Sequence, residues 1–452
     1  MSQKSKTIFV QICKTMNKWL LVILALLCIV ACDDEVATSA DVQPVASADT
    51  LHLGMVLAGN SSQTYQLKLY NRNTSDLKLT SVKLRNAETS GFRMNVDGMN
   101  GAVFTDSNLL RIAAGDSLFI FVEATFAKGT NLEDRHLDYI DIACNGKTQT
   151  VVLDALCKNV KEYHGHIVKA NEVVREDEGI QVFDSLVITK DAEFLMLPGA
   201  TLYLHDKAKI VVYGSLNLQG SQDKPVVIRG DRMDNMFDNL PYDNLPSQWG
   251  SIVLTKDSHD NVIRFADVHG MNEGILIQSD AEIYSSRIKN SDGNLITAFE
   301  ADVKMTNCEL MNAAGSLLEV VGGSTVVTYC TLANYNFAAP IRQEALRISY
   351  TNPETGEEIP LRRCELTNCI VWGRRYEVST ELGIFDHCLV NEDPLFVKID
   401  DENYTYDLHL SAESSCIGAG RPIETAETAV DIEGKPRKEK PSVGCYEYTN
   451  SK

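Results

Sequence analysis

The feature that most constrains the fold is a repeat of about 20 residues in the second half of the chain. Six segments align without gaps on a column of small residues, at successive spacings of 20, 22, 22, 39 and 19 residues. Apolar residues stand three positions before and two positions after each small residue. The small column is Ala266, Ser286, Cys308, Cys330, Cys369 and Cys388; the column before it is Ile263, Ile283, Met305, Val327, Leu366 and Phe385; the column after it is Val268, Ile288, Leu310, Leu332, Val371 and Val390.

This pattern does not fit one uninterrupted strand, because side chains three residues apart on a strand point to opposite faces. The small column and the apolar column three residues before it can both point inward only if the chain bends between them, as it does at the corner of a stacked coil. Coils of about 20 residues that stack in register form a parallel solenoid. A fourth column is rich in Gly and Asn, which tolerate left-handed turns: Gly270, Asn290, Asn312, Asn334, Gly373 and Glu392. The repeat therefore predicts an all-β chain with a parallel β-helix over 160–392.

Residues 50–158 carry a different pattern, in which short runs alternate apolar and polar residues between turns. Tyr65–Tyr70 and Leu118–Ala124 are two such runs, and Asn145-Gly146 separates two more as a hairpin turn. About seven such strands predict an immunoglobulin-like β-sandwich.

The stretch 1–31 has the features of an export signal. It holds four lysines and no acidic residue, and it ends in the unbroken apolar run Trp19–Ala31. A run of this length is typical of a signal-peptide core and short for a membrane span. The run closes as Ile29-Val30-Ala31-Cys32, which resembles a bacterial lipobox and implies lipid on Cys32 and a membrane anchor. An ordinary signal peptide or a signal anchor is the alternative.

Residues 32–49 are expected to form an acidic, flexible tether. Asp33, Asp34 and Glu35 follow the cysteine directly, which resembles a signal for display on the outer face of the outer membrane; a solvated tether would have the same composition. We therefore expect a lipoprotein of the cell envelope, in the outer membrane and exposed at the surface. The net charge of −20 argues against nucleic acid and anionic membrane surfaces as partners.

Several short motifs resemble those of a known superfamily. They are Val212-Tyr-Gly-Ser-Leu-Asn217, Gln248-Trp-Gly-Ser-Ile252, Asp393-Pro-Leu-Phe396, Ser414–Gly420 and Gly444–Tyr448. Together they resemble bacterial right-handed β-helix repeat proteins of the pectate-lyase-like superfamily. Residues 393–449 resemble the choice-of-anchor Q region that closes such helices. The resemblance implies a right-handed coil, but no activity, because this fold carries lyases, hydrolases, epimerases and inert spikes.

Nine cysteines follow Cys32, an odd number that leaves at least one unpaired. Four of them lie in the small column, where we expect buried thiols that behave as small hydrophobes. Cys416 and Cys445 both lie in the closing region and are candidates for a disulfide. The two close CxxC pairs that a zinc site would need are missing from the sequence.

The stretch 230–249 is the strongest candidate for a site. Four aspartates, a guanidinium and two aromatic rings fall within it: Asp231, Asp234, Asp238, Asp243, Arg232, Tyr242 and Trp249. Carboxylates are ligands for Ca²⁺, and rings beside charged groups suit a sugar. The alternative is a long structural loop whose aspartates make local turn hydrogen bonds.

Arg287-Ile288-Lys289 matches a tripeptide with which polygalacturonases hold a substrate carboxylate. The other motifs of that family are missing from the sequence, and Ile288 lies in the inward column. We therefore expect Arg287 and Lys289 simply to face solvent.

Three functions remain open. The first is a non-catalytic lipoprotein that binds a polysaccharide or another macromolecule along the coil. The second is a polysaccharide lyase or glycoside hydrolase, with Ca²⁺ on the aspartates between Asp231 and Asp243 and with Arg232 as the base. The third is a structural protein of the envelope.

Overall fold

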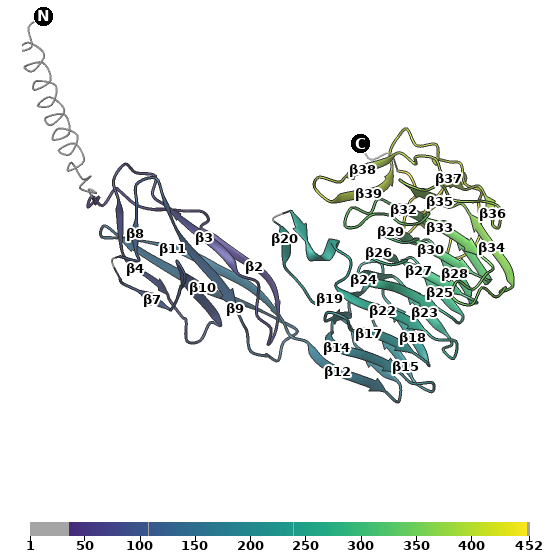
Figure 1. Ribbon diagram of the computed structural model, residues 1–452, viewed down its shortest axis with the longest axis horizontal. Helices are drawn as coiled ribbons and strands as arrows, with labels where there is room; N and C mark the ends of the chain where they lie inside the picture. Colours follow the sequence, from purple (N-terminus) through teal and green to yellow (C-terminus); the bar gives the residue numbers. More distant parts are fainter. Residues whose placement is uncertain (1–35, 107, 238, 450–452) are drawn as a thin grey trace, which may run out of the picture. The chain divides into compact units, whose positions relative to one another are not determined.

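The structure of the chain, a computed structural model, describes residues 36–106, 108–237 and 239–449. Almost all regular structure in these residues is β, with large parallel sheets, which confirms the all-β prediction (Figure 1). No helix among them is long and apolar enough to cross a membrane. The chain divides into two units: one contains the segments up to Leu53, Ser61–Phe126 and Arg135–Ala155, and the other contains Gly54–Asn60, Ala127–Asp134 and the rest of the chain from Leu156.

The first unit is built from two sheets. Side chains alternate between buried and partly buried along strands such as β9, because successive residues of a strand point to opposite faces. Antiparallel pairings join β3 to β9, β9 to β5, and β4 to β10. One sheet has the order β1 (Val45–Ala46), β3 (Tyr65–Tyr70), β9 (Ser117–Ala124), β5 (Phe92–Val96) and β6 (Met99–Asn100); the other has the order β2 (Thr50–Leu57), β11 (Lys147–Lys158), β10 (Glu133–Cys144), β4 (Leu77–Leu84) and β7 (Val103–Phe104), with β8 (Arg111–Ile112) also on β4. The stretch that we expected to be a tether thus contributes β1 to a sheet.

The second unit is a stacked coil in which each turn of the chain crosses three faces. Face 1 consists of β13 (Glu172–Val174), β15 (Glu193–Met196), β18 (Ser215–Gln219), β23 (Asn261–Arg264), β25 (Ala281–Tyr284), β28 (Asp302–Thr306), β31 (Gly323–Thr328), β34 (Leu361–Thr367) and β36 (Ile384–Asp386). Face 2 consists of β16 (Thr201–Leu204), β19 (Val226–Gly230), β26 (Arg287–Ser291), β29 (Glu309–Ala313), β32 (Thr331–Asn334), β35 (Ile370–Gly373) and β37 (Leu389–Val390). Face 3 consists of β17 (Lys209–Val212), β22 (Trp249–Leu254), β27 (Ile296–Phe299), β30 (Leu318–Val321) and β33 (Leu346–Ser349). Three long strands bend from face 2 to face 3: β12 (Lys161–Val168), β14 (Gly179–Ile188) and β24 (Ala266–Ile277).

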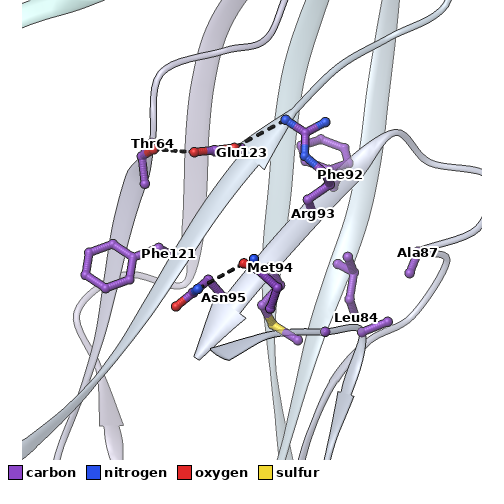
Figure 2. Close-up of a pocket in the computed structure, with 12 residues that line it drawn as sticks. Thr64, Leu84, Ala87, Phe92, Arg93, Met94, Asn95, Phe121 and Glu123 are labelled. Atoms are coloured by element: carbon purple, nitrogen blue, oxygen red, sulfur yellow. Dashed lines mark hydrogen bonds and ion pairs between the residues drawn. The ribbon is translucent and has the colours of Figure 1, made fainter. Parts of the chain in front are cut away.

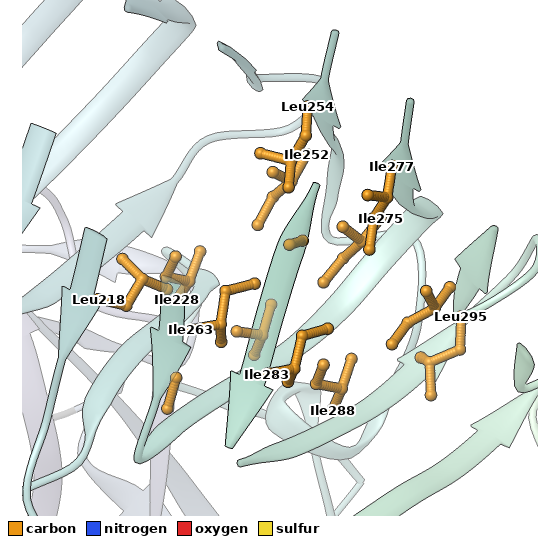
Figure 3. Close-up of a cluster of buried hydrophobic side chains, with 14 of the residues drawn as sticks. Leu218, Ile228, Ile252, Leu254, Ile263, Ile275, Ile277, Ile283, Ile288 and Leu295 are labelled. Carbon is orange, nitrogen blue, oxygen red and sulfur yellow. The ribbon is translucent and has the colours of Figure 1, made fainter. Parts of the chain in front are cut away.

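The predicted columns are in register in the structure. The apolar column before the small residues pairs strand by strand along face 1, from Ile263 to Phe385. The apolar column after them pairs in the same way along face 2, from Val268 to Val390. Figure 3 shows Ile263, Ile283 and Ile288 together in the buried cluster. The repeat in the sequence is therefore the stacking repeat of the structure.

A left-handed residue produces the bend between the two columns. The residue directly before each small position has a positive φ: Phe265 (47°), Ser285 (45°), Asn307 (53°), Tyr329 (51°), Asn368 (56°) and His387 (52°). Non-glycine residues adopt this region at a cost of about 1–2 kcal/mol each. The small residue that follows is then turned into the interior.

The small residues also form a ladder along the stack. The backbone N–H of Ala266 donates to Ser286 Oγ at 3.0 Å, and that of Cys308 donates to Cys330 Sγ at 3.3 Å. Cys330 and Cys369 donate in the same way to the sulfurs of Cys369 and Cys388, at 3.4 and 3.3 Å. Each side chain thus accepts a hydrogen bond that a buried corner amide needs. The thiols of this column are free, as predicted.

The closing region packs against the outer side of face 2. It contains the antiparallel hairpin β38 (Phe396–Asp400) and β39 (Thr405–Leu410), and its apolar side chains share one core with Ala333 and Ile370. Cys416 and Cys445 lie in this core as two buried free thiols, so the predicted disulfide between them is wrong. Each is accommodated as an apolar side chain, and the backbone N–H of Cys445 donates to Thr331 Oγ1 of the coil at 3.0 Å.

Candidate functional site

The outward side chains of face 2 divide into a charged block and an apolar block. In register, one outward column runs Asp267, Arg287, Glu309, Thr331 and Ile370, and the next runs His269, Lys289, Met311, Ala333 and Trp372; Arg229 lies near this second column, where it pairs with Asp243. The apolar block lies under the closing region, whose core includes Ala333 and Ile370. The charged block occupies the middle of the face.

Two projecting segments flank the charged block. The first is the loop that contains β20 (Asn235–Phe237), β21 (Leu240–Pro241) and the 3₁₀ turn η1 (Tyr242–Asn244); the second is the hairpin β38–β39. Both project from the same side of the coil in Figure 1. Asn239 Nδ2 of the loop donates to the backbone oxygen of Glu402, at the turn of the hairpin, at 3.3 Å.

Between these segments lies a pocket of about 510 Å³, a size typical of small-molecule sites. Its residues come from the loop, from face 2 and from the closing region, which are far apart in the sequence. The lining includes Asn244, Arg287, Lys289, Asn290, Glu309, Met311, Asn312, Phe337, Tyr404, Tyr406, Asp407, His409 and Tyr446.

A chain of alternating charges runs along face 2 and reaches the pocket at Lys289. Asp243 Oδ1 lies 2.7 Å from Arg229 Nη2 and 2.8 Å from His269 Nε2. His269 Nδ1 lies 2.7 Å from Asp267 Oδ1, and Asp267 Oδ2 lies 3.5 Å from Lys289 Nζ. The negative charge of Asp267 raises the pKa of Lys289, so this ammonium stays protonated. Burial raises the pKa of Asp267, but Lys289 and His269 outweigh it and lower that pKa overall.

A second cluster joins the coil to the closing region. The Tyr446 hydroxyl donates to Glu309 Oε2, and both side chains are buried. Arg287 Nη2 lies 3.5 Å from the Tyr446 hydroxyl and 3.9 Å from Glu433 Oε1, distances that leave donor capacity toward the pocket. Burial would lower the pKa of Arg287, but Tyr446 and Glu309 outweigh it and raise it.

Aromatic rings form another part of the lining. Phe337, which follows β32, lies with its ring centroid 4.6 Å from that of Tyr404 and 6.2 Å from that of Tyr406. The rings of Phe337 and Tyr406 are nearly parallel, with an interplanar angle of 15°. The pocket therefore combines flat ring surfaces with amides, carboxylates and cations.

The predicted loop residues do not converge on one site. Asp231 accepts a hydrogen bond from Gln181 Nε2 at 2.9 Å and lies 2.7 Å from His205 Nδ1. Arg232 donates to Asp234 at 3.0 Å, and its guanidinium lies 3.5 Å from the centre of the Tyr242 ring. Asp243 pairs through its carboxylate with side chains of the charged block, whereas Arg232 meets the block through its backbone oxygen, which accepts from Arg229 Nη2 at 2.9 Å. In the described part of the chain, no group of three or more His, Cys, Asp or Glu side chains is arranged to hold a metal ion.

Three further predicted residues need separate mention. Trp249 is fully buried, because it begins β22 with its ring in the core and its Nε1 donates to the backbone oxygen of His269 at 2.8 Å. Our prediction that Trp249 stacks on a sugar is therefore wrong. Asp238 and Cys32 lie outside the residues that the structure describes.

The expectation that Arg287 and Lys289 simply face solvent is also wrong. Both point away from the interior, as the register of Ile288 requires, but the closing region and the loop partly cover them, and the Lys289 side chain is 25% exposed. A signal for this was present in the repeat. The positions one and three residues after the small column carry charges in the first repeats and apolar or small residues in the later ones.

The first unit has a hollow of its own, of about 610 Å³. Phe92, Met94 and Leu84 give it an apolar lining (Figure 2). Its polar groups are paired with one another: Thr64 and Arg93 donate to Glu123, and Asn95 donates to Asn100. The pocket on face 2 has more charged side chains in its lining than this hollow.

Comparisons with known proteins assign no family to this chain. No family model matches it, and no curated protein matches it. Similar solved structures include a protein of unknown function from Porphyromonas gingivalis, with 17% identity, 26% of this chain and 49% of that chain covered and a TM-score of 0.19. A PapD-like domain of human CEP192 shows 9% identity over 26% of this chain and 86% of that chain, with a TM-score of 0.18. The Vibrio cholerae VesB protease shows 12% identity over 27% of this chain and 33% of that chain, with a TM-score of 0.19. TM-scores of this size do not establish a shared fold.

Proposed function

We propose that this chain is a lipid-anchored protein of the cell envelope that binds a glycan in the pocket on face 2 without cleaving it. In this proposal the stacked coil is a right-handed parallel β-helix of the pectate-lyase-like kind, preceded by an immunoglobulin-like sandwich. The in-register parallel strands support the first assignment. The two sheets of the first unit, with their antiparallel pairings, support the second.

The observation that carries the binding proposal is the composition of the pocket. Phe337, Tyr404 and Tyr406 offer ring faces on which the apolar face of a sugar can pack. Asn290 and Asn312 also line the pocket, and their amides have hydrogen-bonding capacity beyond the bond from Asn290 Nδ2 to the Asp243 backbone oxygen and the bond that Asn312 Oδ1 accepts from the Tyr335 backbone. The cations Arg287 and Lys289 beside them add charged donors. A lining in which rings stand among amides and charged groups suits a sugar, because a sugar offers both an apolar face and hydroxyls.

The protonation of Lys289 and Arg232 argues against either of them as the base of a lyase. A lyase needs a base that can take a proton from the sugar, and a group of that kind has a pKa near the working pH. The pKa of Lys289 is raised by Asp267, and the pKa of Arg232, the base considered from the sequence, is raised by its hydrogen bond with Asp234. Both groups therefore stay protonated and act as donors.

The test is a screen of the purified full-length protein against an array of polysaccharides and oligosaccharides, with products assayed for new reducing ends and for unsaturated sugars. We expect binding to at least one glycan, and no product. Phe337→Ala should weaken that binding at least tenfold. Formation of product would favour the hydrolase or lyase. The absence of binding to any glycan would favour a structural protein of the envelope.

The anchor is tested separately. Cys32→Ala should leave an unlipidated chain that salt releases from the membrane fraction. Protease added to intact cells should degrade the wild-type protein if it is displayed at the surface. Firm membrane attachment of the Cys32→Ala protein would contradict the anchor, and full protection from protease would contradict surface display.

A further inference from the structure

We propose that His269 is a proton-dependent latch that holds η1 against the outer side of face 2. The imidazole is buried, with 4% of its side chain exposed. Its two nitrogens face two carboxylates, Asp267 of the same strand at 2.7 Å and Asp243 of η1 at 2.8 Å. A neutral imidazole has one donor and one acceptor, so a ring that donates to both carboxylates must carry the second proton.

Apart from Asp243, η1 is held by polar contacts of Tyr242: its backbone N–H donates to the Asp234 backbone oxygen at 3.0 Å, and the Arg232 guanidinium lies 3.5 Å from the centre of its ring. None of its three residues is buried, so apolar packing contributes little there. The Asp243 carboxylate contacts Arg229 of β19 as well as His269, and the Asp243 backbone oxygen accepts from Asn290 Nδ2 at 3.3 Å. The next residue, Asn244, lines the pocket. When the ring loses a proton it keeps one N–H, so one of the two carboxylates loses its donor, and η1 is held less firmly, by Arg229 and Asn290.

The charges that face His269 come from every element packed around it. Asp267 lies on its own strand, Asp243 on η1, and Lys289 on the neighbouring β26, while Arg229 on β19 acts through Asp243. Burial lowers the pKa of His269, and Lys289 opposes protonation too, but the two carboxylates outweigh them and raise that pKa above its usual 6.5.

The direction of the pH effect follows from these shifts. The pKa of His269 is raised on folding, so the latch is complete below about pH 6.5 and is lost as the pH rises through the pKa of the folded protein. At the acid end, burial would raise the pKa of Asp243, but His269 and Arg229 outweigh it and hold that pKa below 3.8. Asp243 therefore keeps its charge until the pH falls below that value. The latch is closed below about pH 6.5 and opens as the pH rises through the pKa of His269 in the folded protein.

Hydrogen exchange of the purified full-length protein tests this directly, because it reads the loop and needs no ligand. Exchange of the peptide 239–248 is measured by mass spectrometry from pH 5 to pH 9 and corrected for the intrinsic rate. We expect protection to fall about tenfold or more with rising pH, the size that loss of one charge-assisted hydrogen bond produces. In Asp243→Asn and His269→Gln the protection should be low at every pH. Titration of the His269 ring by NMR should give a pKa above 6.5.

His205→Gln is the matched control, because His205 bonds to Asp231 of the same loop but has 54% of its side chain exposed. It should keep the wild-type pH dependence. If His269→Gln does not fold, the proposal is tested by the pH dependence of exchange in the wild-type protein and in Asp243→Asn. Protection that does not change with pH, a His269 pKa at or below 6.5, or a pH dependence that survives Asp243→Asn would each overturn the latch.

Discussion

Leu310 and Glu309 are adjacent in β29, but their neighbours come from different parts of the chain. Leu310 points inward and pairs in register with Ile288 and Leu332, one coil away on either side. Glu309 points outward and is bonded to Tyr446, 137 residues further along the chain. Inward positions depend on the repeat itself, whereas outward positions depend on which distant segment covers them. The core can therefore be predicted from the repeat alone, whereas the site also depends on the distant segments that cover it.

The largest loss of stability should come from a substitution on the inward side of β29. Leu310→Ala removes a fully buried side chain, and we expect it to lower the free energy of unfolding by about 2–5 kcal/mol. Met311→Ala, on the next residue and the outer side, should lower it by clearly less. Urea unfolding followed by circular dichroism measures both. Equal losses of stability would contradict the assignment of Leu310 to the inward side and Met311 to the outward side of β29.

The next effect tests the contact between the coil and the closing region. Tyr446→Phe leaves the buried Glu309 carboxylate without this hydroxyl donor, which should lower the free energy of unfolding by about 1–3 kcal/mol. The control is Tyr406→Phe, whose hydroxyl donates to the exposed carboxylate of Asp401 at 2.9 Å. That change should have a small effect, because water replaces the lost bond. A smaller loss for Tyr446→Phe than for Tyr406→Phe would contradict the assigned burial.

A smaller effect is expected from the ladder of small residues. Cys330→Ala removes the sulfur that accepts from the Cys308 amide, whereas Cys364→Ala removes a buried thiol outside the ladder. Cys330→Ala should therefore destabilise the chain by about 1 kcal/mol more than Cys364→Ala. Thiol labelling should reach Cys308 and Cys330 only after denaturation. Rapid labelling of either in the native protein would place the column on the wrong side of the coil.

The smallest effect is expected in the loop. Asp234 pairs with Arg232, half of whose side chain is exposed, and exposed pairs contribute little to stability. Asp234→Asn should change the free energy of unfolding by no more than about 0.5 kcal/mol. A loss above that range would give the loop a structural role that its contacts do not explain.

The inward columns were predictable because every coil repeats the same local requirement. The aligned residues named from the sequence are paired in the structure without a shift. The corners were not predictable in detail, because Phe265, Tyr329 and His387 adopt positive φ where glycine or asparagine would be expected. The tertiary structure imposes that conformation, since the next residue must turn inward.

The site was predictable only in part, because residues close in sequence need not share partners. Asp231, Asp234 and Asp243 lie in one short stretch of the sequence, yet each bonds to a different group. Trp249 was misjudged because its place at the start of a strand buries it. Arg287 and Lys289 were correctly seen to point outward, but the segments that cover them come from other parts of the chain, outside the repeat.

The most direct test of the central claim compares two arginines. Arg287 lines the pocket on face 2, and Arg232 lies in the loop with Asp234 and Tyr242. Binding of Arg287→Gln and Arg232→Gln to the best glycan of the array is measured by isothermal titration calorimetry. We expect Arg287→Gln to weaken binding at least tenfold and Arg232→Gln to leave it within about twofold, corresponding to about 1.4 and 0.4 kcal/mol. Loss of binding in Arg232→Gln with full binding in Arg287→Gln would move the site from the pocket to the loop.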